Sequence, residues 1–413
     1  MSRTTENKWW DQWISYLLAL VAFLIPAHKK LVPVTVILLA VVLIVRSITT
    51  RTIYTGKKDL PLYLLLGLFI LHLIGITYSE NVSYAWVEVG IKFSFLGFPL
   101  IALVMPVISN ENRNRINVAF VIGCWVYTVV SIATGIYDAI QNKDMAYLSY
   151  ALLSEPYHPT YAATYQAMAV FLLLYKSNWY SYQVVRRYLF LLLLIAMVVF
   201  ISMLASKAGL LALWICLVVT AFYYLKQKLH LKYILGVPVL LLAISITSTR
   251  LLPVTASRIQ SAVTSVQNGT TGHPDMEAEN EVTHAQTSTH LRLVTWSSSW
   301  ELMLRNPMGV GTGDTTNELV KIYERKAEEL AAEKELNAHN QFLQTGAELG
   351  WLGLLLLIGS LSLLFVQSIR TKDLFLLTFL LVCGMNFLFE SFLEVQAGIV
   401  FFCYWVLVSL RQD

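Results

Sequence analysis

The residues best suited to group-transfer chemistry stand at two points of a polar stretch late in the chain. His339 lies in the sequence NAHNQ at 337–341, where this stretch runs into an apolar one. A His at the mouth of a membrane helix can be neutral near pH 7 and can take a proton from a sugar hydroxyl. Arg292 lies earlier in the stretch, and its planar fork of donors suits phosphate oxygens. A helix-capping His and a surface Arg paired with an acid are the plainer interpretations.

Lys207 is a second candidate for binding phosphate. It lies in the sequence ASKAG at 205–209, a tight turn between two apolar runs. A Lys at a helix end commonly reaches toward the lipid headgroups. If Lys207 turns inward instead, it and Arg292 together can bind a lipid-linked pyrophosphate, because two cations in a partly dry cleft hold a dianion more strongly than either alone.

Three further side chains are predicted to contact substrate. Asn340 is next to His339, and His158 and Tyr161 open another apolar run in the sequence HPTY. The plainer interpretation of the last two is a helix that starts at Pro, with an aromatic belt at the membrane interface.

Charged residues also fall within apolar runs or beside them. They are Lys92, Glu348, Glu390 and Glu394. A charge at the centre of a bilayer costs roughly 2.5–3.5 kcal/mol. We therefore expect some of these four side chains to face a polar cleft rather than lipid.

Glycines recur around the same region. Gly309, Gly311 and Gly313 permit a tight turn whose amides approach an anion, although the turn has no phosphate-loop Lys. Gly346 and Gly350 have the spacing of a close helix-packing pair, which is the simpler interpretation of these two.

The chain of 413 residues has the composition of a membrane protein. Its 30 Lys and Arg and 26 Asp and Glu make up 14% of the residues, whereas a soluble globular protein carries roughly 25% charged residues. Hydrophobic residues amount to 56%. Residues 250–342 are the exception, with 8 Lys and Arg and 12 Asp and Glu. This composition argues against a cytosolic enzyme and indicates a membrane protein with one polar insert.

Twelve apolar runs have about the length that a helix needs to cross a bilayer, roughly 20 residues. They cover residues 13–28, 31–50, 60–78, 87–108, 116–138, 158–176, 188–205, 208–225, 232–249, 343–366, 374–392 and 394–410. The predicted fold class is an all-α polytopic membrane protein with about 12 transmembrane helices.

The insert divides the chain into helices 1–9 at 1–249, a large helical loop at 250–342, and helices 10–12 at 343–413. Lys and Arg gather in the links on the side of both termini. The positive-inside rule then places both termini in the cytoplasm and the insert on the other side, which is the periplasm in a bacterial envelope. Within the insert we expect a loop at 267–289 and a solvated helix at 317–336.

Other kinds of site are excluded by what the sequence lacks. It contains no Asp-x-Asp pair, Walker motif, Gly-x-Ser-x-Gly elbow or His-Glu-x-x-His. All four Cys lie in apolar runs, and the net charge of +4 arises in short links. We therefore expect no cofactor, no metal, no nucleotide and no nucleic-acid partner.

Four motifs together resemble the O-antigen ligase superfamily, most closely its O-antigen ligase branch. They are RLxxW from Arg292, PxGxGxG from Pro307, HNxxL from His339 and ExGxxG from Glu348. The superfamily also includes O-antigen polymerases and bacterial protein O-oligosaccharyltransferases. The resemblance extends from about residue 189 to 367, and the N-terminal helices match only in number and hydropathy.

The resemblance implies a membrane glycosyltransferase of GT-C-like architecture that takes a glycan from undecaprenyl pyrophosphate at the periplasmic face of a bacterial inner membrane. His339 corresponds to the essential His of the family and Arg292 to the Arg of its outer loop. Lys207 stands where a Ser-Arg-x-Gly turn has Arg, so it keeps the charge but loses the bidentate fork. Direct displacement at the anomeric carbon, without metal, predicts inversion of configuration.

Within that chemistry we expect transfer of O-antigen polysaccharide to lipid A-core, as in lipopolysaccharide assembly. A length near 400 residues and one large loop late in the chain favour the interpretation as a ligase. The alternatives are an O-antigen or exopolysaccharide polymerase, a protein O-oligosaccharyltransferase with the same donor, and a transporter of lipid-linked glycans. The expected partners are the lipid-linked donor, the lipid A-core acceptor and membrane lipids.

Overall fold

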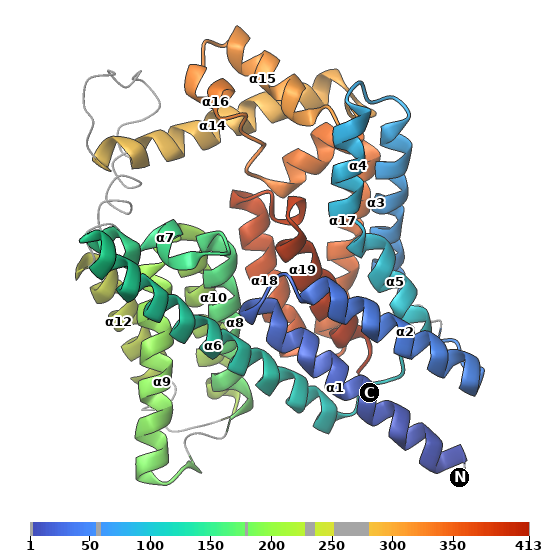
Figure 1. Ribbon diagram of the computed structural model, residues 1–413, viewed down its shortest axis with the longest axis vertical. Coiled ribbons are helices and arrows are strands. Elements are labelled where there is room, and N and C mark those ends of the chain that lie inside the picture. The colour runs from blue at the N-terminus through green and yellow to red at the C-terminus, as the bar shows by residue number, and fades with distance from the viewer. Residues whose placement is uncertain (1–2, 55–58, 178–180, 228–235, 252–280, 413) are drawn as a thin grey trace. The chain divides into compact units, whose positions relative to one another are not determined.

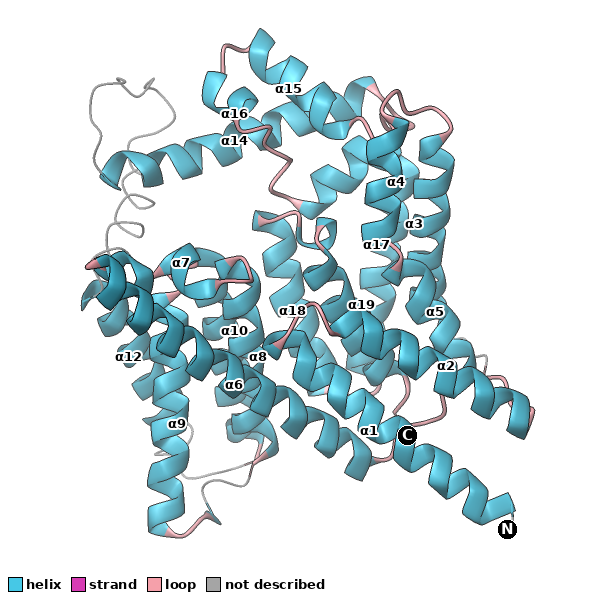
Figure 2. Cartoon of the chain, viewed as in Figure 1, coloured by secondary structure: helices cyan, strands magenta, loops and turns pink. Residues whose placement is uncertain are grey.

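The computed structural model describes residues 3–54, 59–177, 181–227, 236–251 and 281–412. Helices joined by short turns make up this part of the chain, and it contains no β-strand (Figure 2). A chain this apolar folds as helices because a helix satisfies its backbone N–H and C=O groups within its own segment, where lipid offers them no partner. The predicted all-α class is confirmed.

Seven segments of the described residues are long and apolar enough to cross a membrane. They are Trp9–Ala27, Val32–Thr50, Val82–Val104, Asn110–Asn142, Val184–Met203, Lys207–Lys226 and Gln341–Arg370. Shorter apolar helices cover Leu60–Ile76, Gly236–Ser248, Leu374–Phe389 and Gln396–Leu410. Each predicted apolar run coincides with a helix, or with two consecutive helices, wherever the structure describes it. The chain is a multi-pass membrane protein.

The helices form two compact units, of which the first contains residues 1–39 and 110–264. Its described elements are α1 (Arg3–Ala27), α6 (Asn110–Asn142), η2 (Met145–Leu148), α7 (Tyr150–Ser154), α8 (Pro159–Lys176), α9 (Val184–Met203), α10 (Lys207–Lys226) and α12 (Gly236–Leu251) (Figure 1). α1 packs along α6, and α8 packs against α10. Glycines permit both approaches, since a Cβ on Gly123 would lie 2.2 Å from the Phe23 carbonyl oxygen and one on Gly209 would lie 2.2 Å from the Ala163 Cβ.

The second unit contains residues 40–109 and 265–413. Its described elements are α3 (Leu60–Ile76), α4 (Val82–Ile91), α5 (Ser94–Val104), α14 (Glu281–Arg305), α15 (Thr315–Arg325), α16 (Glu329–Glu333), α17 (Gln341–Arg370), α18 (Leu374–Phe389), η4 (Phe392–Glu394) and α19 (Gln396–Leu410). The helix α2 (Val32–Thr50) runs from the first unit into the second. α17 packs along α3 and α18, and α19 is buried over almost its whole length.

The helix α17 is interrupted at Gly350, where φ is +68° and ψ is −165°. The segment 307–311 closes this break with three backbone hydrogen bonds: Trp351 N to Pro307 O at 3.1 Å, Val310 N to Ala347 O at 3.0 Å, and Gly311 N to Glu348 O at 3.1 Å. A Cβ at Gly350 would lie 2.3 Å from the Pro307 oxygen. The expectation that Gly350 serves regular helix packing is therefore wrong, because a discontinuous helix inside the protein needs another backbone segment as its partner.

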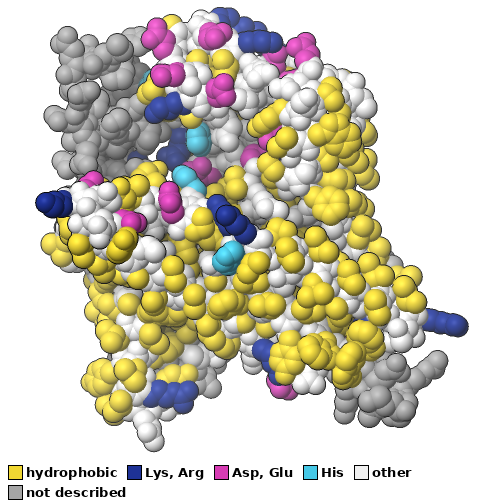
Figure 3. All heavy atoms as spheres, viewed as in Figure 1, with side chains coloured by type: hydrophobic (Ala, Val, Ile, Leu, Met, Phe, Trp, Pro, Cys, Tyr) yellow, Lys and Arg dark blue, Asp and Glu magenta, His cyan; other side chains and the backbone are white. Residues whose placement is uncertain are grey.

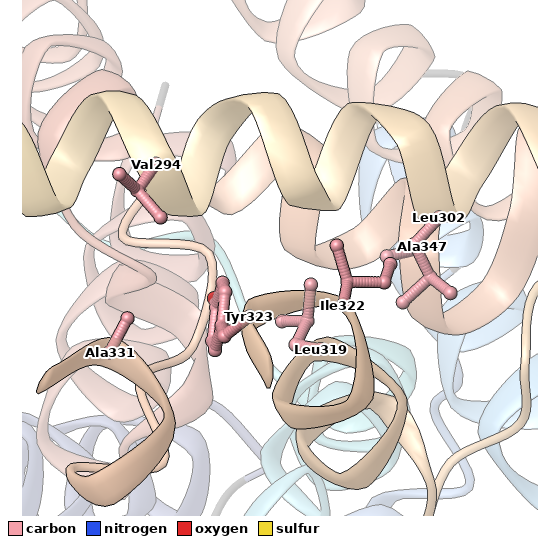
Figure 4. Close-up of a cluster of buried hydrophobic side chains, with 7 residues drawn as sticks. All are labelled: Val294, Leu302, Leu319, Ile322, Tyr323, Ala331 and Ala347. Carbon is pink, nitrogen blue, oxygen red and sulfur yellow. The ribbon is translucent and has the colours of Figure 1, made fainter. Parts of the chain in front are cut away.

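The insert helices α14, α15 and α16 share a small hydrophobic core with α17 (Figure 4). Its members are Val294 and Leu302 of α14, Leu319, Ile322 and Tyr323 of α15, Ala331 of α16 and Ala347 of α17. Several charged side chains lie on the outside of α15 and α16, whereas mainly hydrophobic side chains lie over α3 and α4 (Figure 3). This core fixes α14 against the start of α17, which matters for the site described below.

The expectations for the insert are partly corrected. The helix predicted at 317–336 is two helices, α15 and α16, with a turn between them. Residues 281–289 extend α14 as helix rather than loop, and the rest of the predicted loop, 267–280, lies outside the described residues.

A surface ion cluster also joins α14 to α15. Glu301 Oε1 lies 2.7 Å from Arg305 Nη2 and 2.6 Å from Arg325 Nη2, and Glu301 Oε2 lies 3.1 Å from Lys326 Nζ. The hydrogen bond from Lys326, together with the neighbouring positive charges, lowers the pKa of Glu301. Because the cluster is open to water, its contribution to stability is small.

Gly350→Ala is expected to lower the thermal unfolding midpoint of the detergent-solubilised protein. With φ of +68° and ψ of −165° the residue lies in a backbone region that essentially only Gly occupies, so Ala there is strained by about 1–3 kcal/mol, and its Cβ would collide with the Pro307 carbonyl. Gly359→Ala in the same helix is the matched control, because a Cβ there meets only Leu64 Cδ1 at 3.4 Å. Ala favours a helix interior by about 1 kcal/mol over Gly, so this control should keep or raise the midpoint. Equal midpoints for the two variants would contradict the break at Gly350.

Candidate active site

His339 lies directly before α17, in a backbone conformation with φ of +45°. The preceding segment is held by α14: Trp296 Nε1 donates to the His339 carbonyl oxygen at 3.2 Å, and Thr295 Oγ1 donates to the Ala338 carbonyl oxygen at 3.3 Å. The His339 side chain is 30% exposed. Its backbone is thus fixed by the insert while its imidazole stays accessible.

Glu390 connects the two residues that the sequence singles out. Its Oε1 accepts a hydrogen bond from Arg292 Nη2 at 3.0 Å, and its Oε2 lies 3.3 Å from His339 Nδ1. The carboxylate is 13% exposed and Arg292 is 26% exposed. Arg292 of α14 and His339, which precedes α17, therefore meet at one carboxylate, that of the residue that caps the end of α18. Figure 1 shows these three helices.

The negative charge of Glu390 determines which ring nitrogen of His339 carries the proton. An ionised carboxylate can only accept hydrogen bonds, so His339 Nδ1 carries the proton in its contact with Glu390. The lone pair of the neutral ring is then on Nε2, where it can accept a proton from a substrate. Arg292 donates a charge-assisted hydrogen bond to Glu390, and partial burial strengthens both contacts of this carboxylate relative to water.

Hydrogen bonds between the end of α18 and the start of α17 hold Glu390 beside His339. Asn340 Nδ2 donates to the Leu388 carbonyl oxygen at 3.1 Å, and Ser391 Oγ lies 3.3 Å from Asn337 Oδ1. The site thus rests on three elements that are remote from one another in sequence.

Asn340 has a structural task in this arrangement. Its Oδ1 caps α17 by accepting from the Phe342 and Leu343 N–H groups at 3.0 and 3.1 Å, while its Nδ2 binds Leu388. Both ends of the amide are engaged within the protein, and the residue is 8% exposed. The position is the N-cap that a membrane helix needs for its first N–H groups.

The remaining predicted residues gather where α8 and α10 of the first unit begin. His158 is the N-cap of α8, with its Nδ1 accepting from the Thr160 N–H at 3.4 Å, and its ring lies 6.3 Å from that of Tyr161. Lys207 is the first residue of α10, whose N-cap Ser206 donates to Thr160 Oγ1 at 3.2 Å. His158 and Tyr161 therefore lie at the start of α8 and Lys207 at the start of α10, the helix starts expected from the sequence.

Glu390 is the site residue whose role the sequence does not reveal. The only signal is a carboxylate at the edge of an apolar run, and Lys92, Glu348 and Glu394 give the same signal. Only the fold shows which of the four stands beside His339. No group of three or more His, Cys, Asp or Glu side chains in the described part of the chain could hold a metal ion.

Substitutions of Asn340 should test its role as the N-cap of α17. Asn340→Ala removes the cap and is expected to destabilise the protein by about 0.5–2 kcal/mol. Asn340→Asp keeps the acceptor for the Phe342 and Leu343 N–H groups, so it should lower the stability less. The measurement is the thermal unfolding midpoint of the purified variants without substrate. An unchanged midpoint for Asn340→Ala would contradict the cap.

Comparison with protein families gives one match in the region that carries this site. Residues 191–358 match the family model described as O-Antigen ligase. The matched part contains Lys207, Arg292, His339 and Asn340, while Glu390 lies beyond it. A search of curated proteins finds no match to the chain. This match over residues 191–358 supports the O-antigen ligase superfamily, as the RLxxW and HNxxL motifs predict.

Proposed function

We propose that the protein is a membrane glycosyltransferase that transfers a glycan from undecaprenyl pyrophosphate to lipid A-core at the periplasmic face of a bacterial inner membrane. The observation that carries the proposal is the contact of Arg292 and His339 through Glu390, within a chain that has an O-antigen ligase domain. A base held by a carboxylate, beside an Arg, is what transfer from a lipid pyrophosphate to a hydroxyl requires.

In the proposed reaction His339 Nε2 takes the proton of the acceptor hydroxyl. The freed lone pair of the acceptor oxygen forms a bond to the anomeric carbon, and the bond from this carbon to the pyrophosphate oxygen breaks. The electron pair of that bond leaves on undecaprenyl pyrophosphate, so the configuration at the anomeric carbon is inverted. Glu390 accepts the hydrogen bond from Nδ1 throughout and offsets the positive charge that the imidazole gains.

The leaving pyrophosphate needs positive charge close to its oxygens. Arg292 is partly exposed and contributes one Nη2–H to Glu390, which leaves other donors of its planar fork for phosphate. Lys207 stays a predicted phosphate contact. Its ammonium is a point charge that can stabilise an oxyanion without the paired geometry of an Arg.

Lipid A-core is the acceptor that we favour because the chain carries one polar insert and the family description names a ligase. The same base and the same donor would also serve a polymerase or a protein O-oligosaccharyltransferase, so only the acceptor separates these activities. A transporter of lipid-linked glycans would form no covalent product.

Purified protein in nanodiscs is expected to glycosylate lipid A-core with an undecaprenyl-pyrophosphate glycan as donor and with EDTA present. Glycosylated lipid A-core supports the proposal. If none of the tested acceptors becomes glycosylated, the proposal is contradicted. A lengthened donor glycan would identify a polymerase, a glycosylated carrier protein would identify an oligosaccharyltransferase, and donor flux across the membrane without product would identify a transporter.

Substitutions at the site should lower transfer in a defined order. His339→Ala removes the base and is expected to lower kcat about 10²–10⁴-fold. Glu390→Gln leaves the imidazole without its carboxylate partner and should lower kcat by a smaller factor. Arg292→Lys keeps the charge but loses the fork, so it should raise KM for the donor as well.

Arg305→Ala is the matched control for Arg292. Arg305 is on the same helix and also pairs with a glutamate, Glu301, but it is 58% exposed on the surface of the insert. Transfer by this variant should equal that of wild type. Wild-type transfer by His339→Ala would remove His339 from the reaction.

A further inference from the structure

A lysine and a glutamate from distant parts of the sequence form a buried ion pair in the second unit. Lys92 follows α4 and its side chain is 1% exposed, and its ammonium contacts the carboxylate of Glu394 in η4. A second carboxylate, that of Glu88 one turn earlier in α4, lies 3.3 Å from Lys92 Nζ. A charge removed from water is unfavourable unless it is paired. Lys92 therefore ties η4 to α4.

Gln341 joins Glu394 to the start of α17. Glu394 Oε1 accepts a hydrogen bond of 2.9 Å from Gln341 Nε2, and Gln341 Oε1 accepts one of 2.5 Å from the Leu393 N–H. Gln341 is 2% exposed and is the first residue of α17. Because its amide both donates to η4 and accepts from it, the first turn of α17 cannot move relative to η4 without losing a hydrogen bond in a dry environment.

His339 and Glu390 lie directly beside these contacts. His339 precedes Gln341 by two residues, and Glu390 precedes Glu394 by four. The Asn340 to Leu388 hydrogen bond binds the same two segments on the other side of Glu390. The 3.3 Å contact between the imidazole and the Glu390 carboxylate thus has the Asn340–Leu388 hydrogen bond on one side and, on the other, the hydrogen bond from Gln341 to Glu394 of the buried charge pair.

We propose that Lys92 and Glu394 are positioning residues for the His339 base. The chain of contacts from Lys92 through Glu394 and Gln341 sets the distance between the Glu390 carboxylate and the imidazole. The inference rests on the proposed function, because it takes His339 as the base. Neither residue touches the reacting atoms, and both act through Gln341 and the turn that follows Glu390. A displacement of about 1 Å at a catalytic group can lower a rate about 100-fold.

Glu88 provides the comparison that separates positioning from general stability. Glu88 and Glu394 are partners of the same lysine, and both side chains are 11% exposed. Only Glu394 is hydrogen-bonded to Gln341. Loss of either carboxylate leaves Lys92 with the other one, so a purely structural role predicts similar effects for the two substitutions.

The kinetic test compares Glu394→Gln with Glu88→Gln in the transfer assay. Glu394→Gln is expected to lower kcat about 10- to 100-fold with KM unchanged, and Glu88→Gln is expected to leave both at wild-type values. Glu394→Asp retains the charge and should recover part of the lost kcat. Lys92→Met alone leaves the buried Glu394 carboxylate without its cation, and adding Glu394→Gln removes that charge, so the double variant should have a higher unfolding midpoint than Lys92→Met while its kcat stays low.

A second measurement does not depend on transfer. Diethyl pyrocarbonate modifies accessible imidazoles, and mass spectrometry of peptides gives the rate at His339. We expect faster modification in Glu394→Gln, because the ring is released from Glu390, and the wild-type rate in Glu88→Gln.

The two measurements keep this inference distinct from the proposed function. If the wild-type protein transfers no glycan, the proposed function is refuted. If His339 is nevertheless modified faster in Glu394→Gln and at the wild-type rate in Glu88→Gln, the positioning role is supported. Equal modification rates in wild type, Glu394→Gln and Glu88→Gln would overturn the positioning, whatever the transfer assay gives. Equal losses of kcat in the two single variants would also overturn it.

Discussion

Polar groups that lie among apolar helices have to find partners on other helices, because neither lipid nor an apolar core can hydrogen-bond them. This constraint accounts for the long-range contacts of the second unit. Arg411 at the end of α19 is 2% exposed and is held by Asp59 before α3 and by the Ala102 carbonyl oxygen. Lys92 reaches Glu394 in the same way. Each pair joins segments that are hundreds of residues apart, so each fixes a contact between helices that are remote in sequence.

The same constraint applies to the backbone and explains the glycine motif. The break at Gly350 frees the carbonyl oxygens of Ala347 and Glu348, and the 307–311 segment supplies the N–H groups that they need. Gly309 has φ of +81°, and a Cβ on it would lie 2.3 Å from the Glu348 carbonyl oxygen. The PxGxGxG motif therefore supplies the backbone hydrogen-bond partners that α17 needs at its break. It also fixes the far end of α14, the helix that carries Arg292, against the helix that His339 precedes.

Much of this organisation could be predicted from residue type and spacing. The apolar runs coincide with helices because helix formation in lipid is a local matter of length and hydropathy. His339 and Arg292 could be selected because their side-chain chemistry is recognisable without a fold. Glu390 and Gln341 could not, since a carboxylate or an amide at a helix end has many possible partners and the sequence contains no distance between α17 and α18. The capping role of Asn340 was open to prediction from its place before an apolar run.

The sequence by itself determined that this chain is an all-helical membrane protein and which segments are helical. These follow from composition and local periodicity, whereas the side-chain types of His339 and Arg292 only made them candidates for a base and a phosphate contact. Only the tertiary structure decided that Glu390 bridges Arg292 and His339, that Gly350 interrupts a helix, and that Lys92 is tied through Glu394 to the residues after His339. The physical reason is that hydrogen bonds and ion pairs depend on distances of about 3 Å between side chains, and such distances between remote segments arise only when the helices pack.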